Sequence, residues 1–200
     1  MKFNYSSISS LDHMTHINNL DSIMRHGLLA HDNPYKCVDI SNLDVNSRRK
    51  KQESVYGKSI HEYVPFYFNP RNAMMYKNRE QDIIILGFDK KLLLKSDVLF
   101  TDKNAAASTA KFYNNIDDLE KINVDLLVSS SWNNEPEIVK QTMMAEVLVP
   151  KSVCIEDLVC IYCKDEMKRD ALMRRNDLSS IKIIVEPEYF FLPNRRVLCS

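Results

Sequence analysis

Three kinds of side chain that could do chemistry together stand far apart in this sequence: a carboxylate, two guanidiniums and two imidazoles. Glu146 interrupts the otherwise apolar stretch from Met143 to Val149. A carboxylate that faces a core must be paired or functional, although a charge at the edge of a sheet is the alternative interpretation. In a functional role, such a carboxylate can accept a proton or stabilise a developing positive charge.

The guanidiniums are those of Arg48 and Arg49, which open a basic run that continues through Lys51. A guanidinium presents a planar fork of donors that matches phosphate and carboxylate oxygens bidentately, which a lysine cannot do. The pair therefore indicates an anion-binding function. Solvated surface charge is the alternative interpretation for Arg48.

The imidazoles are those of His13 and His16, which lie three residues apart. In an extended strand this spacing directs them to opposite faces, so at most one can face a given pocket. A lone histidine on a strand is more often a satisfied structural residue than a catalytic one. The spacing alone does not decide between these roles.

The element that must position these groups is the aromatic run from Tyr63 to Phe68. Its β-formers predict a buried strand, which Asn69-Pro70 ends before a short helix that begins near Asn72. By alternation, Tyr67 faces the side opposite to Phe66 and Phe68. Such a run could also be plain core, since aromatic side chains bury large areas.

Patterning elsewhere predicts further strands and helices around this run. Asn18 or Asn19 can cap a helix after the strand 13–17, and Gly27 ends it. The polar stretch 31–47, which contains Tyr35, is long enough to be a functional lid. The other predicted strands are 82–88, 98–102, 145–149, 155–162 and 180–191. The other predicted helices are 45–52, an amphipathic helix over 105–113, helix and linker over 116–127, 137–142 and 165–175.

Composition limits the class of protein. The 200 residues fit one domain spanning 1–200, and the 27 basic and 27 acidic residues give no global field for nucleic acid, so any such contact must be local. No apolar run is long enough to predict a membrane span. Five scattered cysteines fit a reducing compartment rather than a disulfide framework. We therefore expect a cytoplasmic protein.

One motif is more specific than any of these patterns. The string His61-Glu-Tyr-Val-Pro-Phe-Tyr-Phe-Asn-Pro-Arg71, taken with the segments 12–20, Arg48-Arg49 and 144–150 in this order, resembles the DarT family. The resemblance runs from about His13 to Pro150, with a weaker tail. It implies an α+β fold of the ADP-ribosyltransferase type, in which helices flank a central mixed or antiparallel β-sheet.

The resemblance also implies a function. DarT proteins are toxins that transfer ADP-ribose from NAD to a base of single-stranded DNA, thymidine or guanosine, and so block replication. NAD would be the substrate, no metal is expected, and the implied partner is a DarG-type macrodomain antitoxin; a monomer is expected. The catalytic residues would be Glu146 and Arg49. The NAD-binding residues would be His13, Thr15, Asn18, Arg49, Tyr67 and Met74.

Contacts to DNA are expected from a second set of residues, Arg48, Arg71, Trp132 and Lys140. Trp132 could stack on a nucleobase or could equally anchor its own loop. Phe100-Thr101-Asp102 matches the family pattern, but Asn104 stands where relatives usually carry a histidine.

Two other functions stay open. A catalytically inactive relative could clamp single-stranded DNA without transfer, and an active one could modify RNA or protein. An enzyme would add the mass of one ADP-ribose to an oligonucleotide, whereas a binding module would only retard its migration.

Overall fold

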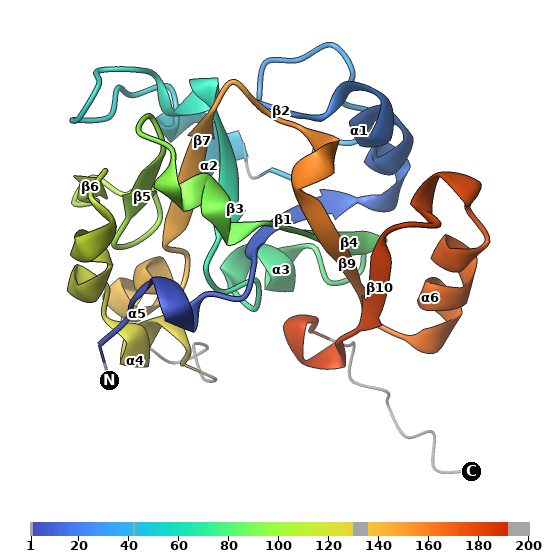
Figure 1. Ribbon diagram of the computed structural model, residues 1–200. Coiled ribbons are helices and arrows are strands. Elements are labelled where there is room, and N and C mark those ends of the chain that lie inside the picture. The colour runs from blue at the N-terminus through green and yellow to red at the C-terminus, as the bar shows by residue number, and fades with distance from the viewer. Residues whose placement is uncertain (1, 42, 130–135, 192–200) are drawn as a thin grey trace.

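The computed structural model describes residues 2–41, 43–129 and 136–191. A mixed sheet of eight strands runs through the middle of the molecule (Figure 1). In spatial order the strands are β10 (Lys182–Val185), β9 (Leu158–Cys163), β4 (Ile83–Phe88), β1 (Leu11–His16), β3 (Tyr63–Tyr67), β7 (Glu146–Pro150), β5 (Leu99–Thr101) and β6 (Phe112–Tyr113). Only β9 and β10 pair in parallel; the other neighbours are antiparallel. The expected mixed sheet flanked by helices is confirmed.

A small second sheet joins β2 (Leu28–Leu29) to β8 (Ser152–Val153). The α-helices are short: α1 (Leu20–His26), α2 (Leu43–Arg48), α3 (Ala73–Lys77), α4 (Val124–Leu127), α5 (Glu137–Thr142) and α6 (Glu166–Met173). Turns of 3-10 helix are η1 (Tyr5–Ser7), η2 (Ile17–Asn19), η3 (Ile60–Glu62), η4 (Lys90–Leu94), η5 (Ile116–Lys121), η6 (Ile155–Asp157), η7 (Asn176–Leu178) and η8 (Pro187–Tyr189). None of the described helices has the length and apolarity needed to cross a membrane.

Local sequence accounts for several boundaries. Asn72 caps α3, because its side-chain oxygen accepts from the backbone N–H groups of Met74 and Met75. Gly27 ends α1 with a φ of +76°, and a Cβ there would lie 2.8 Å from the carbonyl oxygen of Val153. Only glycine combines that backbone angle with that close approach. The end of α1 is therefore fixed against the second sheet.

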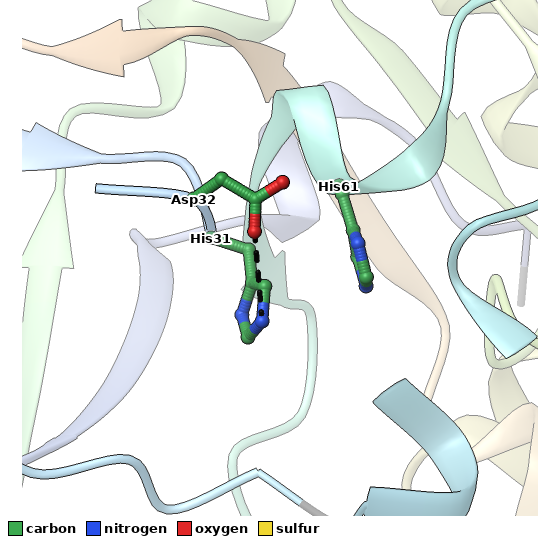
Figure 2. Close-up of side chains that lie close together, drawn as sticks. All are labelled: His31, Asp32 and His61. Atoms are coloured by element: carbon green, nitrogen blue, oxygen red, sulfur yellow. Dashed lines mark ion pairs between the residues drawn. The ribbon is translucent and has the colours of Figure 1, made fainter. Parts of the chain in front are cut away.

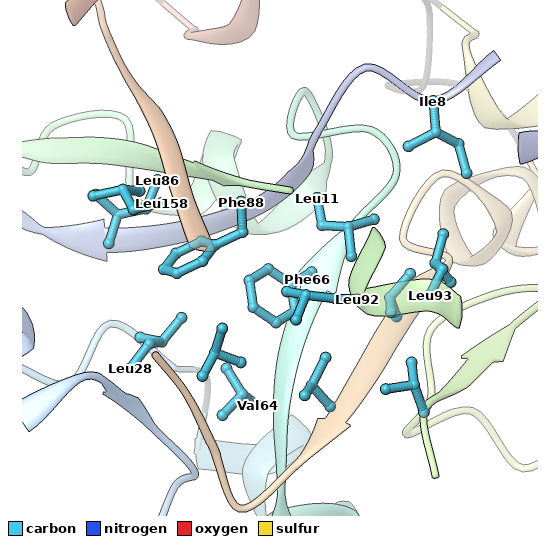
Figure 3. Packing of buried hydrophobic residues seen from close by; sticks show 14 of the residues in the cluster. Ile8, Leu11, Leu28, Val64, Phe66, Leu86, Phe88, Leu92, Leu93 and Leu158 are labelled. Atoms are coloured by element: carbon cyan, nitrogen blue, oxygen red, sulfur yellow. The ribbon is translucent and has the colours of Figure 1, made fainter. Parts of the chain in front are cut away.

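The main hydrophobic core covers one face of the sheet. Figure 3 shows Leu11, Val64, Phe66 and Phe88 converging with Leu92 from η4. All of them are almost fully buried. Removing an aromatic side chain from such a core costs about 3–5 kcal/mol. This face supports the sheet, while the opposite face is left to smaller apolar clusters and to polar groups.

The sheet has an opening between its central strands β1 and β3. The two strands share one Cα pair, Asp12 with Tyr67, whereas β1 pairs with β4 along its whole length. Pro65 has no N–H and cannot donate to β1, and its carbonyl is bonded by a side chain instead, with His13 Nδ1 at 2.8 Å from the oxygen. The proline therefore removes one of the hydrogen bonds that β3 could otherwise donate to β1.

One predicted element is wrong. The stretch 105–113 forms turns and the strand β6 instead of an amphipathic helix. Ala105 is fully buried and its N–H donates to the Glu146 carboxylate at 2.9 Å, while Phe112 pairs with β5. Tertiary contacts thus override the helix propensity of the alanines. The predicted strands 155–162 and 180–191 are shorter in the structure, as β9 and β10.

Candidate active site

A cavity of about 360 Å³ lies beside the opening between β1 and β3. Its volume is in the range of small-molecule sites. The wall combines residues of β1 and β3 with the loop 31–41, the helix α2 and the neighbourhood of α5. Its members include His13, Thr15, Asn19, Tyr35, Arg48, Arg49, Pro65, Tyr67, Met74, Asn104, Lys140 and Met144.

The carboxylate and the guanidinium expected to act together are in direct contact. Arg49 Nη1 lies 3.1 Å from Oε1 and 2.8 Å from Oε2 of Glu146. The Glu146 side chain is fully buried, and that of Arg49 is 13% exposed. Arg49 lines the cavity and Glu146 lies behind it. The sheet-edge interpretation of Glu146 is thereby excluded, because β7 lies inside the sheet between β3 and β5.

Strand register places Tyr67 beside this pair. Tyr67 of β3 is the Cα partner of Glu146 of β7, and directly opposed residues of antiparallel strands present their side chains on one face. Burial, followed by the charge of Glu146, raises the pKa of Tyr67. Its hydroxyl donates to the sulfur of Met74 at 3.0 Å. Alternation along β3 therefore predicted the orientation of Tyr67 correctly.

The tautomer of His13 follows from its backbone partner. Because the Pro65 oxygen can only accept, Nδ1 of His13 carries the hydrogen and Nε2 keeps a lone pair. Burial lowers the pKa of His13 to about 4, against the opposing effect of the Pro65 bond. At neutral pH, His13 therefore offers the cavity an uncharged hydrogen-bond acceptor.

One donor of Arg49 has no partner within the described part of the chain. Its Nη2 is buried and makes no hydrogen bond to any residue that the structure describes. A buried unpaired donor is costly, and this one belongs to a side chain that forms part of the cavity wall. The arrangement fits an oxygen of a bound ligand, such as a phosphate or ribose oxygen.

The polar contacts behind the loop 31–41 come from Asn19 rather than from Asn18. Asn19 is buried and donates to Thr15 Oγ1 at 3.0 Å and to the carbonyl of Val38 at 2.8 Å, while its Oδ1 accepts from the N–H groups of Cys37 and Val38. Asn18 is exposed and is not part of the cavity wall. Asn19 occupies the N-cap position of α1 but makes no side-chain cap bond there, so the predicted cap is wrong. Sequence could not distinguish the two neighbours, because both were candidates for that position.

The residues expected to contact DNA are in different situations. Arg48 and Lys140 line the cavity. Arg71 donates to the carbonyls of Glu188 and Phe190, so its guanidinium holds the chain after β10. Trp132 lies outside the described residues.

Asn104 lies in the cavity wall and is nearly buried. Its side-chain oxygen accepts from the N–H of Ala106, and its own N–H donates to the carbonyl of Gln141. These bonds hold the turn that carries the N–H of Ala105 to Glu146. The N–H of Ala105 was not predicted from the sequence, because no pattern of side chains indicates a backbone donor.

Comparison with known proteins identifies the family of this chain. The family model described as "ssDNA thymidine ADP-ribosyltransferase, DarT" matches residues 13–191. A "DNA ADP-ribosyl transferase" of Thermus sp. (strain 2.9) is 31% identical over 76% of this chain and 79% of its own length. A "DNA ADP-ribosyl transferase-DNA ADP-ribosyl glycohydrolase fusion protein" of Thermosipho africanus is 29% identical over 94% of this chain, which spans 50% of that protein.

Solved structures share the fold. The Thermus sp. 2.9 DarT in complex with ADP-ribosylated ssDNA superposes with a TM-score of 0.84 at 25% identity, covering 96% of this chain and 100% of that one. The same Thermus protein in complex with NAD+ gives a TM-score of 0.79 at 25% identity, covering 92% of this chain and 98% of that one. The chain therefore belongs to the DarT family.

Proposed function

We propose that this chain transfers ADP-ribose from NAD+ to a base of single-stranded DNA. The observation that carries the proposal is the Arg49–Glu146 pair, whose carboxylate is fully buried directly behind the wall of a cavity. A binding module has no need of a buried carboxylate beside its ligand. The related Thermus protein was solved both with NAD+ and with ADP-ribosylated ssDNA.

The cavity offers groups suited to NAD+. The lone pair on His13 Nε2 can accept from a ribose hydroxyl, and the unpaired Nη2 of Arg49 can donate to a phosphate or ribose oxygen. Tyr67 and Met74 supply apolar surface for a planar ring. We infer that these four residues, with Thr15 held by Asn19, bind the substrate NAD+.

In the proposed reaction, the bond between C1′ of the ribose and the nicotinamide nitrogen breaks, and its electron pair leaves with nicotinamide. A ring nitrogen of the base then forms the new bond to C1′ and gives up its N–H proton to Glu146. A carboxylate can accept roughly four hydrogen bonds. Arg49 and Ala105 occupy two positions on Oε1 and Arg49 occupies one on Oε2. We therefore assign Oε2 as the atom that takes the proton.

Glu146 would also stabilise the positive charge that develops on the ribose as nicotinamide leaves. Arg49 holds this carboxylate in its orientation through contacts to both oxygens. Arg49 also lines the cavity, so it contacts the catalytic carboxylate of Glu146 on one side and faces the bound NAD+ on the other.

The preference for single strands follows from the chemistry. In a duplex the Watson–Crick edge of a base is paired, and extruding the base costs a few kcal/mol. Lys140 and Arg48 line the cavity and can contact DNA phosphates; Trp132 and Arg71 remain proposed contacts. The family description favours thymidine as the target base.

We further propose that an enzyme which removes ADP-ribose from DNA counteracts this one, in the manner of a DarG-type macrodomain antitoxin. The Thermosipho relative, named as a fusion of a transferase with a glycohydrolase, supports this pairing. Co-expression should restore the growth of cells that this chain alone arrests. An unchanged growth arrest, with the glycohydrolase active on modified DNA, would refute the pairing.

The transfer is tested by incubating the protein with NAD+ and a short single-stranded oligonucleotide of mixed sequence. We expect the oligonucleotide to gain the mass of one ADP-ribose, and the same sequence as a duplex to gain none. Labelled NAD+ offered with DNA, RNA and protein in competition identifies the acceptor. Label on RNA or protein alone would contradict the proposed substrate, and retardation of the oligonucleotide without transfer would contradict the proposed activity.

A further inference from the structure

A second cluster of chemically capable side chains lies next to the active site. His31 follows β2, Asp32 is its neighbour, and His61 belongs to η3; potential ligand atoms of the three lie within 4.8 Å of one another. Figure 2 shows His31 and Asp32 on one segment and His61 on the facing turn. The two imidazole rings are stacked, with centroids 4.6 Å apart. By residue type, this cluster could hold a divalent cation.

The contacts of Asn46 favour another role. Its amide Nδ2 lies 2.9 Å from His31 Nε2, and its Oδ1 lies 2.9 Å from His61 Nε2. The amide therefore bridges the ring nitrogens that a cation would need. In addition, Lys36 Nζ is 3.3 Å from Nδ1 of His31, which places a positive charge beside the cluster. The cluster is a hydrogen-bonded network around Asn46.

The network defines the tautomer of His61. Both ring nitrogens of His31 face donors instead, the Asn46 amide at Nε2 and the Lys36 ammonium at Nδ1. His61 Nε2 faces two acceptors of Asn46, the backbone oxygen and Oδ1, both at 2.9 Å, and must carry its hydrogen there. His61 thus donates to the backbone and to the side chain of the same residue.

Asn46 connects this network to the active-site arginine. The backbone oxygen that accepts from His61 also accepts from the N–H of Arg49 at 3.1 Å. Two further contacts join the same segments: Ser59 Oγ lies 3.5 Å from the Arg49 oxygen, and the N–H of Ile60 donates to the Lys51 oxygen at 3.1 Å. The turn η3 therefore lies along the backbone on both sides of Arg49.

We propose that His61 is a positioning residue, which holds the end of α2 through Asn46 so that Arg49 meets Glu146. The role rests on the proposed transferase function and adds a residue to it. Arg49 is the first residue after α2, a helix of only six residues, so the helix alone does little to fix the position of its guanidinium. The donor from His61 supplies that support from η3, whose own geometry is fixed by the Ser59–Glu62 capping box.

The test compares His61→Gln with His61→Asn. The amide nitrogen of glutamine reaches about as far from Cα as Nε2, whereas that of asparagine reaches only as far as Nδ1. We expect His61→Asn to lower kcat about 10- to 100-fold, the loss typical of a misplaced catalytic group, with KM for the oligonucleotide unchanged. His61→Gln should keep kcat within about threefold of the wild-type value, since it restores the donor. His16→Asn is the matched control, because His16 only caps η2.

Asn46→Ala provides a second variant, should His61→Asn fail to fold. It removes the side-chain bridge but leaves the backbone acceptor, so we expect a smaller loss of kcat than His61→Asn gives. If His61→Asn is insoluble, the comparison is made with the double variant His61→Gln/Asn46→Ala, which should lose more kcat than Asn46→Ala alone. Equal kcat for folded His61→Asn and wild type would overturn the positioning role, as would an unchanged kcat in Asn46→Ala. Absence of transfer by the wild-type protein would instead contradict the proposed function.

The metal alternative is decided in the same preparation. We expect elemental analysis of the wild-type protein to find no stoichiometric zinc, and kcat to be unaffected by EDTA. Stoichiometric zinc that is lost in His31→Ala would overturn the hydrogen-bonded role of the cluster.

Discussion

The substitution Glu146→Gln separates the chemistry of the site from its architecture. Glutamine keeps the shape of glutamate and retains one oxygen that can accept from Ala105 and Arg49, but it cannot take a proton from a base. General-base catalysis typically contributes about 10²–10⁴-fold, which corresponds to roughly 3–5 kcal/mol of activation free energy. We expect kcat for transfer to fall by this factor.

The same substitution should also destabilise the fold. Removing one partner of a buried ion pair costs about 3–5 kcal/mol. The Arg49 side chain retains 13% exposure, which favours the lower end of that range. For a domain of this size, about 3 kcal/mol lowers Tm by roughly 6–12 °C. Activity must therefore be compared at a temperature at which both proteins are folded.

The chain offers a matched control in Glu53, the other nearly buried glutamate among the described residues. Glu53 accepts from the N–H groups of Val55, Tyr56 and Lys58 and from the hydroxyl of Tyr63. Tyr63 lines the cavity, but Glu53 itself does not. Glu53→Gln should also lower Tm, but kcat per folded molecule should be unchanged. Single-turnover transfer, read as the mass of the oligonucleotide, measures both variants. A Glu146→Gln protein that keeps kcat within threefold of wild type would refute the role of Oε2.

Three further predictions concern neighbouring groups. Arg49→Lys should lower kcat/KM at least tenfold in the same assay, because one ammonium cannot hold both Glu146 oxygens and also reach the ligand; equal kcat/KM would contradict this. Asn19→Ala should weaken NAD+ binding in calorimetry by releasing the loop at Cys37 and Val38 from β1, and an unchanged Kd would count against a closing loop. Burial, opposed by the Ser10 bond, raises the pKa of Asp12 to about 7, so the folded protein keeps a proton that the unfolded chain releases near pH 4. The free energy of unfolding therefore falls by up to about 4 kcal/mol as pH rises from about 4 to 7. Above pH 7 this contribution is constant. Asp12→Asn should remove that fall in denaturant melts across this pH range, and parallel curves for the two proteins would refute it.

The parts of the site that could be predicted from the sequence are those where a residue type allows a single structural role. The strand around Tyr67, the helix that begins near Asn72 and the glycine stop at Gly27 are local features, and the structure confirms each of them. A glutamate inside an apolar strand required a partner, and the partner is an arginine. Burial of charge is a strong constraint, so these residues carried more information than the periodicity around them.

The remainder depends on tertiary contacts that no local pattern encodes. Ala105 has helix propensity, but its backbone N–H serves Glu146 and its small side chain fills a fully buried position. Asn19 and Asn18 are the same residue type, and only the geometry of η2 decides which of them faces Thr15. Arg71 belongs to the most specific motif, but its donors hold carbonyls more than a hundred residues away.

The seam between β1 and β3 makes one imidazole indispensable in two separate ways. Without His13, the oxygen of Pro65 would lose a side-chain donor at the same moment as the cavity loses an acceptor. Any substitution there combines a folding defect with a binding defect, and loss of activity alone cannot distinguish them. A residue other than proline at position 65 would regain a backbone N–H beside the carbonyl that His13 contacts, and with it a donor that β3 lacks toward β1.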